Sequence, residues 1–328
     1  GTAANRVKLY VNGEQQSWNN TKYPSLNQES DWMNTNDLYI GTKWASNSSG
    51  EGDNDLSGYL AEVVLLDGTA ASPTSFGEVD DDSGIWIPID VSGLTFGSQG
   101  FYLNFSNASS SGEDFSGNDN DLLDSNLSAA DHSTDTPTNN FCTWNSSWQY
   151  LYEPIISEGG TKAGYHNSTD ENAKATIGLT NGKWYWEAKP VGTIGSQFIG
   201  IQTDGDSNLN SAQGILLNYT MVIEPQGRYY SYAGSLSESS AGQFTALTTS
   251  DWLGIALDMD SSTQTIKYYK NGSLILTRDL ISEMQGRTVF PFLQNYESRS
   301  FYINFGGYTI NTISSAESDA NGYGTFEY

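Results

Sequence analysis

The sequence predicts an all-β protein in which two antiparallel β-sandwich modules are joined by a connector rich in Ser, Asn, Asp and Gly. Long helices are unfavourable because Gly, Ser, Thr and Asn are abundant and Lys is scarce. Short apolar or alternating runs recur, and Asn-Gly or Asp-Gly turn signals follow several of them. The 328 residues suggest about two domains, and 13% aromatic residues supply enough large side chains for their cores.

The first expected strand, residues 7–11, alternates apolar and exposed side chains. It runs into Asn12-Gly13, a dipeptide that tolerates the positive φ angles of a type I′ turn. Pro88 cannot donate to a ladder, so the strand that contains it is expected at a sheet edge. Further strands in the first module, residues 1–89, are expected at 38–41, 58–68 and 85–89.

The connector is expected at residues 90–140, which are mostly Ser, Asn, Asp and Gly. Residues 100–105 interrupt this composition and are expected to form one anchored strand. The connector ends near Pro137, because the residue before a proline is pushed out of the helical region.

The second module, residues 141–307, has the denser strand pattern. Residues 265–270 lead into Asn271-Gly272, a second hairpin signal. Other strands are expected at 182–188, 251–260, 274–276, 289–293 and 301–306. The aromatic residues expected at inward strand positions, and therefore in the core, are Trp184, Trp186, Trp252, Phe301 and Phe305.

Four motifs of the second half occur in the order found in SPRY (B30.2-like) domains: GKWYWE, DWLGIALDMDSSTQTIKYYKNGSLI, VFPFL and FYINFGG. The resemblance covers about residues 142–307, half of the chain. It implies a β-sandwich that recognises its ligand through loops at one end.

The first half is similar to another sandwich family. The motifs VKLYVNGE, LYIG and GYLAEVVLLDGTA resemble the C-terminal part of a laminin-G-like (concanavalin-type) module. This resemblance implies glycan or protein binding, often with Ca²⁺.

From residue 58 onward the chain resembles modular virion proteins of marine bacteriophages, which implies a tail fibre-like protein on the virion surface, outside the cell. Both ends stop inside recognisable patterns. The chain is therefore expected to be part of a longer polypeptide, with residues 308–328 as a C-terminal tail that leads to a further segment.

The charge balance excludes several partners. The net charge is −25, and no Lys or Arg occurs between Lys43 and Lys162, so nucleic acid and anionic membranes are not expected partners. No apolar run approaches the roughly 20 residues of a membrane-spanning helix, so membrane insertion is not expected. Cys142 is the single cysteine; it excludes an intramolecular disulfide and is expected to be a small buried thiol.

Catalysis is not expected. Concanavalin-like glucanases carry alternating acids on one strand, whereas apolar residues follow Glu62, and Ala188 and Lys189 follow Glu187. Only two histidines, His132 and His166, are present for a His-based triad or zinc site. A glycan hydrolase remains a remote alternative.

One loop is a candidate Ca²⁺ site. It places hard oxygen ligands at close spacing around a glycine, and a solvated acidic turn is the competing interpretation. The candidate ligands are Asp114, Ser116, Asn118, Asp119 and Asp121.

Aromatic and basic residues in polar surroundings are the candidate ligand-binding groups, because rings stack on apolar ligand faces and arginine donates to hydroxyls and carboxylates. The competing interpretations are contacts between subunits and, for the second group, a strand with half-buried alternate tyrosines. The candidates are Trp18, Trp32 and Trp44 in the first half, and Arg228, Tyr229, Tyr230 and Tyr232 in the second.

Together these features predict a tail fibre or tail-associated virion protein that binds host-surface glycan or protein non-covalently. Other virion proteins, including further copies of the chain, are expected partners. The alternative is a purely structural capsid decoration or filament subunit.

Overall fold

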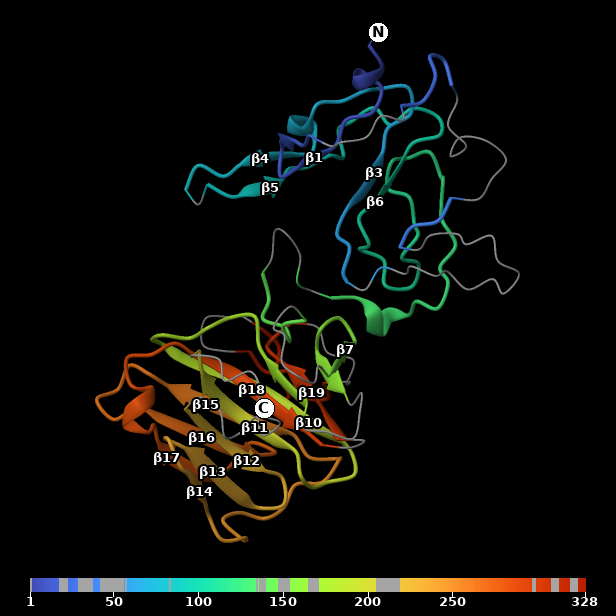
Figure 1. Cartoon of the computed structure of the whole chain (residues 1–328). Coiled ribbons are helices and arrows are strands. Elements are labelled where there is room, and N and C mark those ends of the chain that lie inside the picture. The colour runs from blue at the N-terminus through green and yellow to red at the C-terminus, as the bar shows by residue number, and fades with distance from the viewer. Residues whose placement is uncertain are drawn as a thin grey trace. The chain divides into compact units, whose positions relative to one another are not determined.

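The computed structural model divides the chain into two compact units, Gly1–Leu127 and Ser128–Tyr328 (Figure 1). Every strand pairing among the described residues is antiparallel, which confirms the all-β class. None of the helices in the described ranges is long and apolar enough to cross a membrane. The structure describes residues 2–17, 23–28, 38–41, 56, 58–82, 84–133, 135, 140–146, 154–164, 171–204, 219–296, 299–307, 313–318 and 324–328.

The first unit contains three two-stranded sheets among its described residues. Val91, Phe96 and Tyr102 form its small buried cluster. The expected hairpin turn is confirmed, since Asn12 and Gly13 have φ angles of 50° and 79°. The pairs are β1 (Tyr10–Val11) with β2 (Glu14–Gln15), β3 (Val63–Leu65) with β6 (Phe101–Leu103), and β4 (Gly77–Val79) with β5 (Trp86–Pro88); the 3-10 helices are η1 (Ala3–Asn5) and η3 (Pro73–Ser75).

The first unit differs from the sequence expectation in two ways. Residues 38–41 are not a strand, and the expected strand at 58–68 is reduced to β3, because Glu62 has a φ of 56°, outside extended geometry. The expected connector also begins inside this unit. Its strand β6 pairs with β3, and the unit extends to Leu127.

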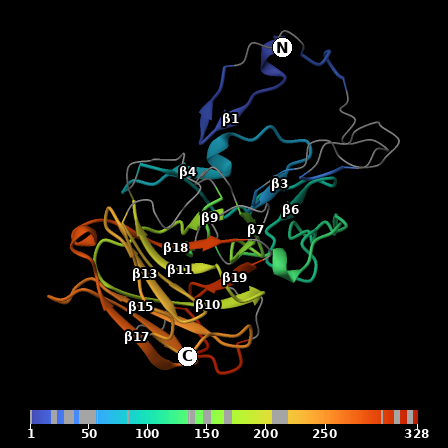
Figure 2. The same cartoon turned by 60° about the horizontal axis from the view of Figure 1, so that its bottom comes forward.

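The second unit is a β-sandwich of a seven-stranded and a six-stranded sheet (Figures 1 and 2). The seven-stranded sheet has the order β17 (Ser273–Asp279), β16 (Thr265–Lys270), β15 (Leu253–Asp258), β10 (Lys183–Gly192), β19 (Arg299–Asn304), β8 (Lys162–Gly164), β7 (Ile155–Ser157). The six-stranded sheet has the order β14 (Leu236–Glu238), β13 (Arg228–Tyr232), β12 (Thr220–Glu224), β11 (Phe198–Thr203), β18 (Val289–Asn295), β9 (Glu171–Lys174). The 3-10 helices η4 (Ala129–Asp131) and η6 (Ser282–Met284) complete the unit.

The main core of the second unit includes Trp186 and Phe301 and lies between the inner faces of the two sheets. Trp252 is buried and Phe305 is half-buried, as expected. Trp184 is not in the core: 43% of it is exposed, and its indole N–H donates to the Asn181 carbonyl 2.6 Å away. The core position predicted for Trp186 is therefore confirmed. The one predicted for Trp184 is wrong, because the first two residues of β10 are exposed.

The C-terminal residues belong to the second unit. Glu317 and Phe326 form an antiparallel bridge, and the Phe326 ring meets Tyr185 edge to face at 5.1 Å between centroids. Cys142 packs half-buried against the core, and burial raises the pKa of its thiol to about 11. A thiol with that pKa remains protonated and unreactive at neutral pH.

Candidate functional site

The Arg228–Tyr232 segment is strand β13, as the competing interpretation held. Gly227, at a φ of 99°, makes the tight turn from β12, and Arg228 then pairs with Glu224. Side chains alternate between the faces of a strand, so Arg228, Tyr230 and Tyr232 share one face and Tyr229 points to the other.

Tyr229 lies on the inner face. Its ring packs partly buried against the main core, and the Arg278 guanidinium stacks over it at 4.9 Å. Tyr229 is therefore placed away from the other three candidate residues.

Tyr230 lies on the outer face of the six-stranded sheet but is only 7% exposed. It forms a separate buried cluster with Val222 and Phe292, and its ring meets Phe198 edge to face at 5.1 Å. Burial raises the pKa of its phenol to about 12, so the hydroxyl stays protonated across the physiological range. Tyr230 therefore packs within the outer face and leaves little surface accessible.

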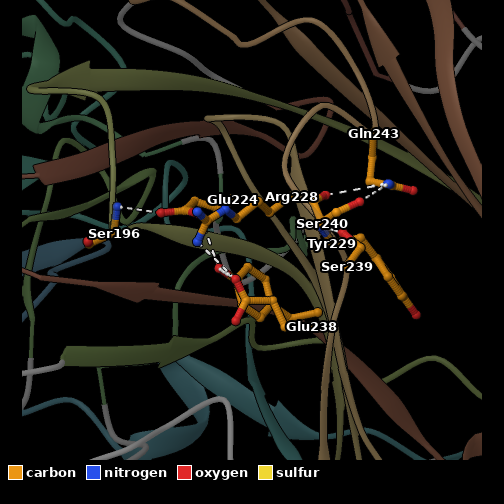
Figure 3. A network of polar contacts seen from close by, with 9 residues as sticks. Ser196, Glu224, Arg228, Tyr229, Glu238, Ser239, Ser240 and Gln243 are labelled. Carbon is orange, nitrogen blue, oxygen red and sulfur yellow. Dashed lines mark hydrogen bonds and ion pairs between the residues drawn. The ribbon is translucent and has the colours of Figure 1, made fainter.

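Two carboxylates meet at the Tyr230 hydroxyl. Its oxygen lies 3.2 Å from Glu224 Oε2 and 3.1 Å from Glu238 Oε1. The backbone N–H of Ser196 donates to Glu224 Oε1 at 3.0 Å, and Arg228 forms an ion pair with Glu238 Oε1 at 2.9 Å (Figure 3). This polar network anchors an arginine at the end of the outer face.

The exposed part of the network is a mixed surface. The side chains of Arg228 and Glu238 are 41% and 45% exposed. Tyr232 is half-exposed, and Leu236, its cross-strand partner on β14, is 43% exposed. Charged, aromatic and apolar groups thus lie together on the β13–β14 hairpin, which we call the β13–β14 surface and define by these four residues.

Sequence reasoning named Arg228 and Tyr232 as candidates but did not name Glu224, Glu238 or Leu236. Glu224 lies in β12, and Leu236 and Glu238 lie in β14. Only the pairing of both strands with β13 brings these residues together. The sequence could have indicated them through the alternation of side chains in a hairpin, because residues opposite Arg228, Tyr230 and Tyr232 project on the same face as these three.

Asp114, the first of the candidate Ca²⁺ ligands, has both carboxylate oxygens occupied by hydrogen-bond donors. Asp114 Oδ1 accepts the N–H groups of Tyr102 and Ser116, both at 2.8 Å. Its Oδ2 accepts the Ser116 hydroxyl at 2.7 Å and the Asn120 N–H at 3.0 Å. Burial alone would raise the pKa of Asp114, but these hydrogen bonds hold it below its usual value. Both oxygens are therefore committed to donors, which leaves none directed at a cation.

Three of the other expected ligands, Ser116, Asn118 and Asp121, form hydrogen bonds around the loop. Asp121 accepts the N–H of Asp114, and the Asn118 amide donates to the carbonyls of Gly97 and Gly100. Asp119 has a positive φ of 58° and lies in the turn. In the described ranges no three His, Cys, Asp or Glu side chains gather in a way that would hold a metal ion.

Trp18, Trp32 and Trp44 lie outside the described residues, so their ligand-binding role stays a prediction.

The comparisons with known proteins identify no family for the chain. No family model matches the chain, and no curated protein matches it. Among solved structures, the PSpry domain of TRIM65 is similar at a TM-score of 0.35 and 11% identity, over 50% of this chain and 89% of that one. A likeness of this size carries no functional argument.

Proposed function

We propose that the chain is a non-enzymatic recognition protein that binds its partner through the β13–β14 surface. The exposed Arg228–Glu238 ion pair is the observation that carries this proposal. A guanidinium has five donors, and one oxygen of Glu238 leaves most of them available. Tyr232 adds half-exposed ring area, and Leu236 adds apolar area. Such a mixture suits a surface glycan or a protein.

The setting we propose is the virion surface of a bacteriophage, as a tail fibre or tail-associated protein that holds a host-surface glycan or protein. The sequence resemblance supports this setting. The net charge of −25 agrees with a protein that works in salty water, where ions screen self-repulsion.

The adhesion test compares two exposed ion pairs. The full chain, labelled with a fluorophore, is applied to a glycan array and to whole marine bacteria. Arg228→Ala and Tyr232→Ala are expected to lower binding about tenfold or more, equal to about 1.4 kcal/mol each. Lys183→Ala is the matched control, because it breaks the exposed pair with Asp258 (3.2 Å) on the other sheet.

Tyr230 is left unchanged because its ring is buried and its loss would damage the fold. If Arg228→Ala and Tyr232→Ala bind like the unaltered chain and melt at the same temperature, the proposal is wrong. The structural alternative, a capsid decoration or filament subunit, then takes its place.

Absence of catalysis is part of the proposal and has a separate test. Glu224 and Glu238 are the paired carboxylates to examine, since both lie near one phenol oxygen. We expect no reducing sugar from β-glucans or bacterial polysaccharides. Release that Glu224→Gln abolishes would make the chain a hydrolase.

A further inference from the structure

Strand β14 is the edge of the six-stranded sheet and pairs only with β13 among the described strands. The N–H of Ser239 donates to the Tyr229 carbonyl at 2.9 Å, and the N–H of Ala233 donates to the Ser235 carbonyl at 3.3 Å. In an antiparallel pair, residues alternate between facing the partner strand and facing away from it. The odd-numbered residues of β14 therefore face β13, and the backbone groups of Leu236 and Glu238 face away.

These outward groups are unpaired in the part of the chain that the structure describes. They offer two N–H donors and two C=O acceptors in extended geometry, which is the template for adding a strand. The opposite edge of the sheet offers no such template, because all four residues of β9 are buried.

The side chains beside this edge favour a positively charged partner. Leu236 and Glu238 project on the outer face, opposite Tyr232 and Tyr230. Oε1 of Glu238 meets both Arg228 and Tyr230, whereas Oε2 has no partner in the described ranges. Glu224 adds a second carboxylate, so two acids surround one arginine, and the whole chain carries −25. A cationic group is therefore favoured next to Glu238, and an apolar one next to Leu236.

We propose that β14 binds an extended segment of a basic partner protein, which adds to the six-stranded sheet as a further strand. Its backbone pairs with Leu236 and Glu238, a lysine or arginine side chain reaches Glu238 Oε2, and an apolar side chain covers Leu236. The proposal rests on the proposed function and deepens it, because it names protein rather than glycan as the partner at the β13–β14 surface.

The probe is an eight-residue peptide in which threonine occupies every second position and lysine alternates with valine at the others, so that a lysine lies beside Glu238 and a valine beside Leu236. Its binding to the full chain is measured by fluorescence anisotropy. Leu236→Pro removes an outward N–H and leaves the pairing with β13 intact, as proline is tolerated on an edge. Glu238→Gln removes the charge but keeps an acceptor for Arg228. Both variants are expected to weaken binding at least tenfold. The same peptide with glutamate in place of each lysine is expected not to bind.

Edge strand β17 provides the matched controls. The bond from the Leu280 N–H to the Gln264 carbonyl places the N–H groups of Thr277 and Asp279 away from β16. Thr277→Pro and Asp279→Asn therefore make the same two changes on another exposed edge, and both are expected to bind the lysine peptide like the unaltered chain. Melting temperatures check that every variant folds.

Three results would overturn the inference. If Leu236→Pro binds the lysine peptide as tightly as the unaltered chain does, the peptide does not pair with the backbone of β14. Equal losses in Glu238→Gln and Asp279→Asn would reduce the effect to non-specific attraction. Absence of lysine-peptide binding, with adhesion that still depends on Arg228 and Tyr232, would end the edge-strand inference and leave the proposed function standing.

Discussion

Asp251 connects the loop before β15 to the β16–β17 turn. Its carboxylate accepts the N–H and hydroxyl of Thr248, both at 2.8 Å, and the Asn271 amide at 2.7 Å, and it pairs with Lys270 at 3.1 Å. Burial alone would raise its pKa, but the hydrogen bonds outweigh burial and hold the pKa at about 2. The folded chain therefore favours the charged form of this residue.

The first prediction is an acid-sensitive contribution of Asp251. A carboxyl whose folded pKa lies below its unfolded value of 3.8 stabilises the fold above about pH 4, and this stabilisation is lost as the pH falls toward 2. Asp251→Asn should lower the free energy of unfolding by about 2 kcal/mol at pH 6. The measurement is urea unfolding at several pH values. A gap between the two proteins that stays constant from pH 6 to pH 2 would contradict the ionic origin.

The loop around Asp114 in the first unit is held by hydrogen bonds from its backbone to its own carboxylates. Besides the four donors to Asp114, Asp124 accepts the N–H groups of Ser111 and Gly112, each at 2.8 Å. The loop therefore fixes its own backbone, and β6 next to it, with carboxylates that accept N–H groups rather than with carboxylates that hold a cation.

The second prediction is that Asp114→Asn destabilises the first unit while metal does not stabilise it. An asparagine would turn an NH₂ group toward N–H or O–H donors, and an unsatisfied buried donor costs about 1–3 kcal/mol. Thermal unfolding of the full chain checks this, with Asp82→Asn as the exposed control. If EDTA lowers the melting temperature and millimolar Ca²⁺ restores it, the loop does hold a metal.

One buried carboxylate accepts two backbone N–H groups of the C-terminal segment. Glu187, on the outer face of β10, accepts the N–H of Glu327 at 2.8 Å and the N–H of Tyr328 at 2.9 Å. Tyr185 and Asn304 donate to the same carboxylate at 3.0 Å and 3.3 Å. Burial raises its pKa, although all four donors act against that rise.

The third prediction is that both Glu187→Ala and Glu187→Gln release this segment. The glutamine is not a rescue, because its NH₂ group would face two of the four donors. Each unsatisfied donor costs about 1–3 kcal/mol. Urea unfolding measures the loss, and hydrogen exchange at the amides of Glu327 and Tyr328 should quicken. Glu283→Gln, at a half-buried site in η6 where the carboxylate accepts the Ser282 hydroxyl at 2.9 Å, serves as the control.

The pH dependence of Glu187 has the opposite sign to that of Asp251. Since its folded pKa lies above the unfolded value of 4.5, its contribution is largest below pH 4.5 and falls as the pH rises through the raised pKa. Slow amide exchange at Glu327 and Tyr328 in Glu187→Gln would show that the segment is held by other contacts.

Sequence reasoning succeeded where the signal is local. Asn271-Gly272 adopts the expected turn, with φ angles of 47° and 76°, because only a few residue types tolerate positive φ at both positions. It failed where distant strands meet: the bond from Glu327 to Glu187 joins residues 140 positions apart. Tyr229 and Tyr230 are adjacent and identical in type, so composition cannot assign their faces, and only pairing with β12 does.

At the scale of the whole molecule, charge is the dominant feature. A net charge of −25 destabilises a compact chain through self-repulsion. Ion pairs oppose this only weakly where they are exposed, as for Arg228 with Glu238, since such pairs contribute about 0–1 kcal/mol. Salt weakens both effects, and the repulsion is the larger because acids outnumber bases by 39 to 14.

The fourth prediction is that NaCl stabilises the chain. The screening length falls from about 30 Å at 0.01 M to about 3 Å at 1 M, so repulsion between acids spread over the surface is largely removed. Each kcal/mol of repulsion that salt removes should raise the melting temperature of the second unit, Ser128–Tyr328, by about 2–4 °C. NaCl and KCl at equal ionic strength should act alike if screening is the cause, and a larger rise in CaCl₂ would reveal bound cations. A melting temperature that falls with NaCl would contradict the prediction, because it would mean that attraction within ion pairs outweighs repulsion between the acids.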